Sequence, residues 1–263
     1  MEKLYVIKIG GNIIESENLL DLFLQDFSTL NYGKVLVHGG GKNATKFAEE
    51  LDIKSMFING RRVTDKKTLR IVDEVYSGLN KDIIIKLFYN GCKAVGYTGK
   101  EDSVISATKR GLLDGVDYGY VGDINEVNGD ALYEKIQQGY VPVMSPLVYD
   151  RETGYKLNTN ADTIAYFTAK SLVKYYEVHL VYCFELKGVL ENIEDKNSVI
   201  PEITPSYYEQ LKQKGIISQG MIPKLDNAFE AIHAGVSSVI ICKADDMKSI
   251  INEGASLGTT IRK

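Results

Sequence analysis

The segment LYVIKIGG at residues 4–11 decides the fold, together with its counterpart KVLVHGGG at residues 34–41. Each is an apolar run typical of a buried strand, and each ends in glycines. Between them, residues 16–30 place apolar side chains at helical spacing, and Ser16 is a suitable N-cap. A strand, a helix and a second strand in this order predict a mainly parallel sheet with helices on both faces.

The same alternation continues to the end of the chain, so we expect one continuous sheet carrying two lobes that meet near Lys174. The lobes would comprise residues 1–174 and 175–263. Hydrophobic periodicity predicts further elements along this length. Strands are expected at residues 140–143, 178–183, 236–242 and 258–261, and helices at residues 43–51, 129–138, 160–173, 221–234 and 245–252.

Two segments allow more than one interpretation. A long helix is expected after Thr64, because its apolar residues recur at spacings of three and four: Leu69, Val72, Tyr76, Leu79, Ile83 and Leu87. This apolar face could pack on the chain's own sheet or form a subunit interface. Residues 93–128 are rich in Gly, Tyr, Asp and Val and suggest β-hairpins that flank a pocket.

Composition excludes several classes of protein. The 263 residues are 44% hydrophobic and 25% charged, as in an ordinary globular protein. A net charge of −4 argues against a dedicated nucleic-acid binder. No apolar run is long enough to span a bilayer and no leader pattern opens the chain, so a cytoplasmic protein is expected. The cysteines are far apart and the histidines lack metal-ligand spacing, so we expect reduced thiols and no bound metal.

Glycines at the two strand ends are candidates for anion binding. Lys8-Ile9-Gly10-Gly11 and His38-Gly39-Gly40-Gly41 each place backbone N–H groups where a chain turns out of a strand. The second cluster also precedes a helix, whose N-terminus attracts anions. Because the carboxyl ends of parallel strands share one edge of a sheet, both clusters should face one crevice.

Other phosphate-binding motifs fit this sequence poorly. Gly39, Gly41 and Ala44 match G-x-G-x-x-A, but the next strand candidate ends at residues 58–60 without the acidic residue that a dinucleotide site requires. A Walker A motif and the H-R-D motif of protein kinases are both absent. The crevice is therefore not expected to belong to a dinucleotide, P-loop or protein-kinase fold.

Three further motifs carry charged or amide side chains at helix starts or glycine turns. In Gly60-Arg61-Arg62-Val63-Thr64, Arg62 could fork onto a carboxylate, although a solvated basic pair is the plainer interpretation. In Asn158-Thr159-Asn160-Ala161-Asp162, capping explains Asn160 and Asp162 but not Asn158. In Gly220-Met221-Ile222-Pro223-Lys224, the lysine opposes the helix dipole, which makes sense if it faces an anion.

Taken together and in this order, the five motifs resemble the amino-acid kinase family. The resemblance implies an open αβα sandwich, with an N-terminal lobe that binds the amino acid and forms a dimer and a C-terminal lobe that binds ATP. It further implies transfer of phosphoryl from ATP to the γ-carboxylate of an N-acyl-L-glutamate. Since the chain begins almost at its first strand, it is similar to short, dimeric, arginine-insensitive members.

The resemblance also implies a role for each matching residue. Lys8 and Lys224 would stabilise the transferring phosphoryl group and Asp162 would orient both lysines. Backbone amides of the glycine clusters would meet phosphate and substrate, and two side chains would hold the acceptor. The residues concerned are Gly10, Gly11, Gly40 and Gly41 for the amides, Arg62 and Asn158 for the acceptor, and Phe184, Glu185, Gly188, Ile216, Ile217 and Ser218 for the nucleotide.

One departure from the family pattern concerns the nucleotide lobe. The family usually has Ser or Thr followed by Asp before a Gly-Val-Leu turn, where this chain has Phe184 and Glu185. This departure bears on the nucleotide contacts and not on the phosphate chemistry. A γ-carboxylate, with a pKa of about 4.3, is ionised at neutral pH, so the reaction needs no general base. Mg²⁺ would arrive with ATP, held by phosphates and waters.

Other functions remain open at this stage. A related kinase of the same fold would act on N-succinylglutamate, carbamate, aspartate or UMP. A catalytically silent amino-acid-sensing module is the alternative from a different class, although the presence of Lys8, Asp162 and Lys224 argues against it. The sequence does not identify the acyl group of the acceptor.

Overall fold

The main sheet runs through the whole molecule. The computed structural model describes residues 1–58, 60–99, 104–217 and 221–263, and within them an eight-stranded sheet forms. Its neighbours are parallel throughout except for one antiparallel pair, β13 with β14, so the predicted mainly parallel sheet is confirmed. In spatial order the strands are β12 (Glu202–Ile203), β14 (Thr259–Ile261), β13 (Ser238–Lys243), β11 (Glu177–Phe184), β1 (Lys3–Ile9), β2 (Gly33–His38), β8 (Val141–Met144) and β5 (Ala94–Tyr97).

Strand β1 lies in the middle of this sheet, and its side chains alternate between two cores. Leu4 and Val6 belong to one hydrophobic cluster, whereas Tyr5, Ile7 and Ile9 belong to the other. This alternation follows from the two-residue repeat of a strand. The same repeat places the next side chain, at position 8, on the Leu4 and Val6 face.

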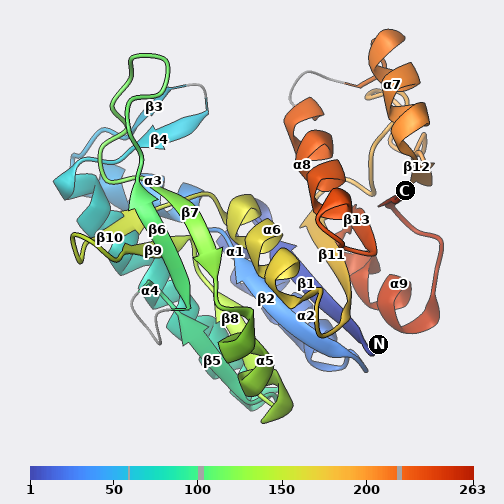
Figure 1. The fold of residues 1–263 in the computed structure, drawn as a ribbon, viewed down its shortest axis with the longest axis horizontal. Coiled ribbons are helices and arrows are strands. Elements are labelled where there is room, and N and C mark those ends of the chain that lie inside the picture. The colour runs from blue at the N-terminus through green and yellow to red at the C-terminus, as the bar shows by residue number, and fades with distance from the viewer. Residues whose placement is uncertain (59, 100–103, 218–220) are drawn as a thin grey trace.

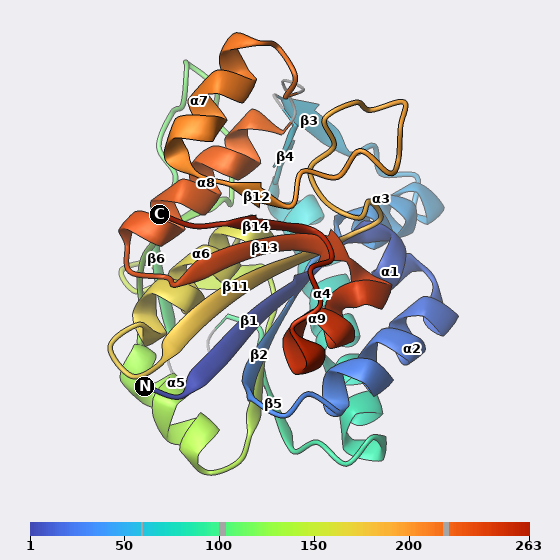
Figure 2. The same cartoon turned by 90° about the vertical axis from the view of Figure 1, so that its right-hand side faces the viewer.

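Helices cover both faces of the sheet, as Figure 2 shows. The cluster that contains Leu4 and Val6 is completed by α5 (Gly129–Gln137), α6 (Ala161–Leu172), α7 (Pro205–Gln213) and α8 (Ile222–His233). The opposite cluster is completed by α1 (Gly11–Glu15), α2 (Glu17–Ser28), α4 (Lys66–Tyr89) and α9 (Met247–Glu253). The αβα sandwich is therefore present, and no helix in the described ranges is both long and apolar enough to cross a membrane.

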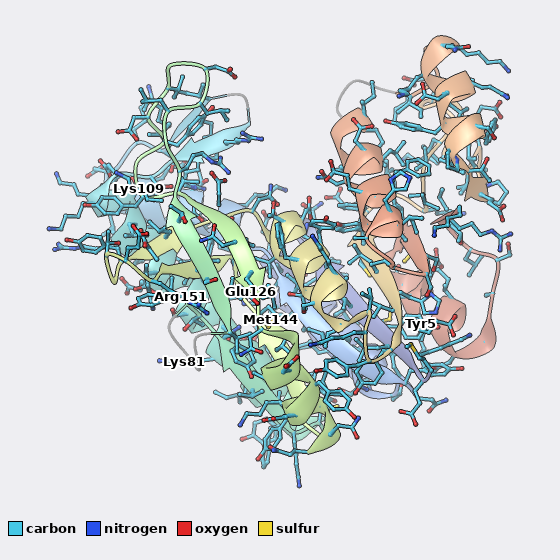
Figure 3. All side chains as sticks on the ribbon, viewed as in Figure 1. Tyr5, Lys81, Lys109, Glu126, Met144 and Arg151 are labelled. Carbon is cyan, nitrogen blue, oxygen red and sulfur yellow. The ribbon has the colours of Figure 1, made fainter. Side chains whose placement is uncertain are left out.

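A smaller β-structure lies beside the N-terminal half of the main sheet (Figure 1). It consists of a four-stranded sheet and a separate hairpin, whose strands are β10 (Lys156–Asn158), β9 (Leu147–Asp150), β6 (Ile105–Lys109) and β7 (Gly122–Val127) in the sheet, and β3 (Met56–Ile58) and β4 (Arg61–Val63) in the hairpin. Lys109 and Glu126, labelled in Figure 3, lie on the antiparallel pair β6 and β7. The expectation of hairpins holds for this pair. It is wrong for residues 94–97, which form β5 and pair in parallel with β8, because a crossover connects them.

The long helix α4 extends over 24 residues and begins where the sequence predicted. Asp65 caps it by accepting a hydrogen bond of 2.7 Å from the backbone of Thr68. Ile83 and Leu87 pack in the core of the chain's own sheet, so the first interpretation of its apolar face is confirmed in part. Helix α3 (Gly41–Glu50) packs on the first half of α4 through a smaller cluster.

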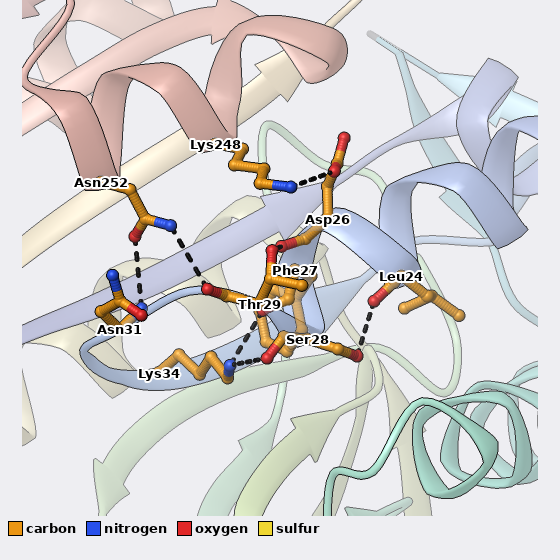
Figure 4. A network of polar contacts seen from close by, with 9 residues as sticks. All are labelled: Leu24, Asp26, Phe27, Ser28, Thr29, Asn31, Lys34, Lys248 and Asn252. Carbon is orange, nitrogen blue, oxygen red and sulfur yellow. Dashed lines mark hydrogen bonds and ion pairs between the residues drawn. The ribbon is translucent and has the colours of Figure 1, made fainter.

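Several contacts join the parts of the chain before and after Lys174, and two of them are prominent. The continuous sheet is one, since β11 pairs with β1 along seven residues. A polar network between the end of α2 and α9 is the other (Figure 4). There, Lys248 lies 3.1 Å from Asp26, and Asn252 donates to the Thr29 carbonyl at 3.3 Å. The lobe boundary itself stays a prediction.

Candidate active site

An ion pair between β1 and α6 forms the centre of the site. Lys8 occupies the face of β1 that packs on α6, and its ammonium nitrogen lies 2.8 Å from Oδ1 of Asp162. The lysine is 8% exposed, so the charge is buried and needs its partner. Asn160 caps α6 by accepting a 2.7 Å hydrogen bond from the Asp162 backbone, as predicted, and so fixes the first turn.

A second ammonium group approaches from α8. Nζ of Lys224 lies 4.2 Å from the ring centroid of Phe184, and Nζ of Lys8 lies 5.4 Å from the same centroid. The negative face of an aromatic ring attracts both cations. Burial lowers the pKa of Lys224, and Asp162 partly opposes that effect. In the described ranges Lys224 makes no ion pair within 4.0 Å, and of the two lysines Asp162 is ion-paired with Lys8 alone.

A small pocket opens between these groups. Its lining consists of Asp162, Tyr182, Phe184, Lys224, Asn227 and Ile241. The hydroxyl of Tyr182 is buried there without a hydrogen-bond partner among the described residues, and burial together with the Asp162 charge raises its pKa. Sequence reasoning missed Tyr182 and Asn227. The strand register offered a signal for the tyrosine, because position 182 lies beside position 8 in the parallel pair of β1 and β11.

The two glycine clusters lie at the edge where β1 and β2 end. Ile9 and His38 are paired in register, so Gly10 and Gly39 leave the sheet side by side. A Cβ at Gly10 would lie 3.2 Å from Nζ of Lys8, which indicates close approach of backbone and ammonium. The clusters and the lysine thus share one edge of the sheet, as the sequence predicted.

A lysine outside the predicted set also reaches this edge. Nζ of Lys42 donates to Oδ1 of Asn12 at 2.6 Å, and a Cβ at Gly11 would lie 3.3 Å from its Cε. Its side chain is 63% exposed, so its charge is largely solvated. Lys42 therefore spans from α3 to α1 beside the glycines without being held in the interior.

Arg62 lies on β4 and is held by the protein's own acceptors. Its guanidinium donates to the Gly41 carbonyl at 2.7 Å, to Thr45 at 2.8 Å and to Ser55 at 2.7 Å. Its centre lies 4.6 Å from the Phe57 ring centroid. Burial lowers its pKa. These contacts place the cation directly against the start of α3, next to the second glycine cluster.

Asn158 ends β10 and is hydrogen-bonded to Thr64, the residue that follows β4. Its Nδ2 donates to Oγ1 of Thr64 at 3.1 Å. Its Oδ1 is buried and has no hydrogen-bond partner in the ranges that the structure describes. A buried amide oxygen without a partner is unusual and indicates a group that is satisfied by a ligand or water. Asn158 is the residue of its motif that helix capping did not explain, and this oxygen is where it is open to a ligand.

The predicted nucleotide residues have diverse environments. Glu185 is exposed, Ile216 is half-buried and Ile217 is buried. A Cβ at Gly188 would lie 2.6 Å from Oγ1 of Thr259, so this glycine packs closely against β14. Ser218 lies outside the described residues. Among the members of this set that the structure describes, Phe184 alone contacts Lys8 and Lys224.

Comparison with known proteins gives a family match and relatives of similar length. The model of the amino acid kinase family matches residues 3–243. Acetylglutamate kinase from Cytophaga hutchinsonii is 52% identical over 262 residues, which cover 99% of each chain. Acetylglutamate kinase from Phocaeicola vulgatus is also 52% identical, over 100% of this chain and 99% of that protein.

Solved structures share the fold. The smu.665 protein from Streptococcus mutans superposes with a TM-score of 0.75 at 31% identity, covering 98% of both chains. N-acetylglutamate synthase from Neisseria gonorrhoeae reaches a TM-score of 0.84 at 21% identity, covering all of this chain and 59% of that one. With the family match over most of its length and relatives half identical to it throughout, this chain belongs to the amino acid kinase family.

Proposed function

We propose that this protein transfers the γ-phosphoryl group of ATP to the γ-carboxylate of an N-acyl-L-glutamate, with N-acetyl-L-glutamate as the acceptor. The observation that carries the proposal is that Lys8 and Lys224 both approach the Phe184 ring beside Asp162, in a chain half identical to acetylglutamate kinases. The product would be an acyl phosphate, and the reaction would serve arginine biosynthesis.

The charge balance of the site suits this reaction. An ionised carboxylate must approach a polyphosphate, so catalysis depends on positioning and on cations that offset the growing negative charge. Lys8 would meet the transferring phosphoryl group from β1, and Lys224 would meet it from α8. Asp162 would keep Lys8 in place without neutralising both lysines, since it contacts one of them.

The acceptor would lie on the side of Arg62 and Asn158. The Arg62 guanidinium offers positive charge next to the second glycine cluster. Oδ1 of Asn158, which has no hydrogen-bond partner among the described residues, could accept a hydrogen bond from the amide N–H of the acyl group. Amides of Gly10, Gly11, Gly40 and Gly41 would bind the transferring phosphate and the acceptor carboxylate.

The nucleotide would lie on the side of β11 and α8. Its predicted contacts are Phe184, Glu185, Gly188, Ile216, Ile217 and Ser218. Asp162, the carboxylate of the pocket, is already paired with Lys8. We therefore propose that Mg²⁺ is carried by phosphate oxygens and waters, where it would offset phosphate charge.

We also propose that the protein is a cytoplasmic homodimer, with residues 1–174 binding the acceptor and residues 175–263 binding ATP. The end of α4 supports the dimer, since Ile85 is 54% exposed, Phe88 71% and Tyr89 83%. Such large apolar side chains together favour association. Light scattering should give twice the mass of 29.3 kDa, and a monomer would contradict this.

An acceptor panel tests the proposed reaction. The protein, ATP and Mg²⁺ would be incubated with N-acetyl-L-glutamate, N-succinyl-L-glutamate, L-aspartate, carbamate or UMP, and hydroxylamine would trap acyl phosphates as hydroxamates. Hydroxamate with N-acetyl-L-glutamate at the highest kcat/KM is the expected result. A preference for the succinyl compound would change the acyl group assigned. Turnover of carbamate or UMP alone, or binding without turnover, would refute the proposal.

A further inference from the structure

His38 is a buried polar residue for which the proposed chemistry has no use. It ends β2, is 0% exposed and lies directly before the second glycine cluster. Its Nδ1 lies 2.7 Å from the Gly39 carbonyl oxygen, and its Nε2 lies 3.0 Å from Nδ2 of Asn80. Asn80 comes from the long helix α4 and is 1% exposed. A histidine and an asparagine therefore form a chain of polar contacts inside an apolar region.

The acceptors in this series of contacts determine which ring nitrogen of His38 carries the proton. A carbonyl oxygen only accepts, so Nδ1 of His38 must carry the proton that it donates to Gly39. In a neutral ring, Nε2 then accepts from the amide of Asn80. That amide also donates to the Val143 carbonyl at 3.0 Å, which fixes its orientation. Burial lowers the pKa of His38 to about 4, so the neutral ring is the form present at pH 7.

This chain of contacts fixes the peptide between Gly39 and Gly40. The N–H of Gly39 donates to the Ile9 carbonyl at 3.1 Å, and its carbonyl accepts from His38. Because C=O and N–H point in opposite directions across a trans peptide, the Gly40 N–H is directed away from the histidine. In the described part of the chain this N–H donates to no acceptor.

The surroundings of Gly40 also restrict its backbone conformation. Its φ of +147° is open to glycine and rarely to other residues, and a Cβ there would lie 2.9 Å from the ring of Tyr76. At the Asn80 end of these contacts, a Cβ at Gly96 would lie 2.1 Å from Oδ1 of Asn80. Both glycines thus make room for the side chains of α4 that hold the loop.

We propose that His38 is a positioning residue, which holds the Gly39–Gly40 peptide so that the Gly40 N–H faces the anion, while Asn80 selects the ring tautomer that can do so. The inference rests on the proposed function, in which the Gly40 amide binds the transferring phosphoryl group or the acceptor carboxylate. A donor fixed before the anion arrives needs no reorganisation during the reaction, which is the source of its catalytic value.

Two substitutions separate the two contacts of the ring. In His38→Asn, the side-chain amide can replace Nδ1 and donate to Gly39, but it is too short to reach Asn80. In His38→Gln, the longer side chain can reach Asn80 in place of Nε2, and the donor to Gly39 is lost. His179→Gln is the matched control, since His179 is a half-buried histidine near the start of β11 and contacts Ser238 of β13.

The kinetic result expected is a loss of kcat of about a hundredfold in His38→Gln, the usual effect of one misplaced oxyanion donor, with KM for ATP little changed. His38→Asn should stay within about tenfold of the parent kcat, and His179→Gln should match the parent. Equal losses in both His38 variants, or full turnover in His38→Gln, would overturn the inference.

Crystal structures of the two variants test the geometry independently of turnover. The Gly39 carbonyl should keep its inward direction in His38→Asn and turn away in His38→Gln. An inward carbonyl in His38→Gln would overturn the inference. If the parent protein phosphorylates no acceptor in the panel, the proposed function fails, and these two structures still decide whether His38 positions the peptide.

Discussion

Lys8 and Asp162 lie 2.8 Å apart although they belong to the first strand and to a helix in the middle of the chain. Lys8 is buried and Asp162 is half-buried, and Lys224 reaches the pocket beside Asp162 from a third element. An arrangement that gathers two ammonium groups around one carboxylate leaves net positive charge for an incoming anion. This relationship explains why the lysine in the first turn of α8 tolerates an unfavourable helix dipole.

Replacing Arg62 should weaken acceptor binding. In Arg62→Ala, KM for the acyl amino acid should rise at least about tenfold while kcat changes less, because a charged hydrogen bond to the bound acceptor is lost. Arg61→Ala is the control, since Arg61 is an exposed neighbour on the same strand. An unchanged acceptor KM in Arg62→Ala would contradict this role.

Activity should fall at alkaline pH as Lys224 loses its proton. Burial lowers the pKa of this amine from 10.5, so the charged form that the reaction needs is lost at a lower pH than for a solvated lysine. The pH profile of kcat/KM should therefore show an alkaline limb below pH 10.5. Lys224→Arg should shift the limb upward, because a guanidinium stays charged. If the alkaline limb does not move in Lys224→Arg, the limb reports the titration of another group.

Stability should fall in acid because of His38. Its pKa is 6.5 unfolded and about 4 folded, so the unfolded chain binds more protons in between. The free energy of unfolding should therefore decrease as pH falls from about 6.5 towards 4 and change little further from this group, with a total of about 3 kcal/mol.

Urea unfolding at pH 7, 5.5 and 4 checks this effect of His38. The parent should lose stability more steeply than His38→Asn, which carries no titrating group at that position. The difference between the two proteins isolates this histidine from the carboxylates, which titrate in both. A constant difference across the three pH values would contradict the assignment.

Sequence patterns predicted most of the fold because the central strands β1, β2, β11 and β13 are long and mostly apolar. Glycines at the ends of the first two strands marked the edge of the sheet that the two clusters share. Short elements were missed, among them α1, β9, β10 and β12, because a few residues carry no period, and the nine-residue helix α7 was missed as well. Residues 94–97 misled the prediction because their Gly and Tyr content is typical of hairpins.

Parts of the site could not be predicted for a different reason. Asn80 is one polar position within a long amphipathic helix, and nothing in the local pattern indicates that it meets His38. Tyr182 reads as part of an apolar strand, and its lone hydroxyl is noticed only when the pocket is formed. Contacts between distant segments depend on packing, which a single sequence does not specify.

The most direct measurement is the kcat of Lys8→Ala, with Lys3→Ala, an exposed lysine on the same strand, as control. Losing one cation at the transferring phosphoryl group should lower kcat by about a hundredfold or more, while thermal unfolding confirms that the variant folds. Lys3→Ala should keep the parent rate. A folded Lys8→Ala protein with full turnover would contradict the account.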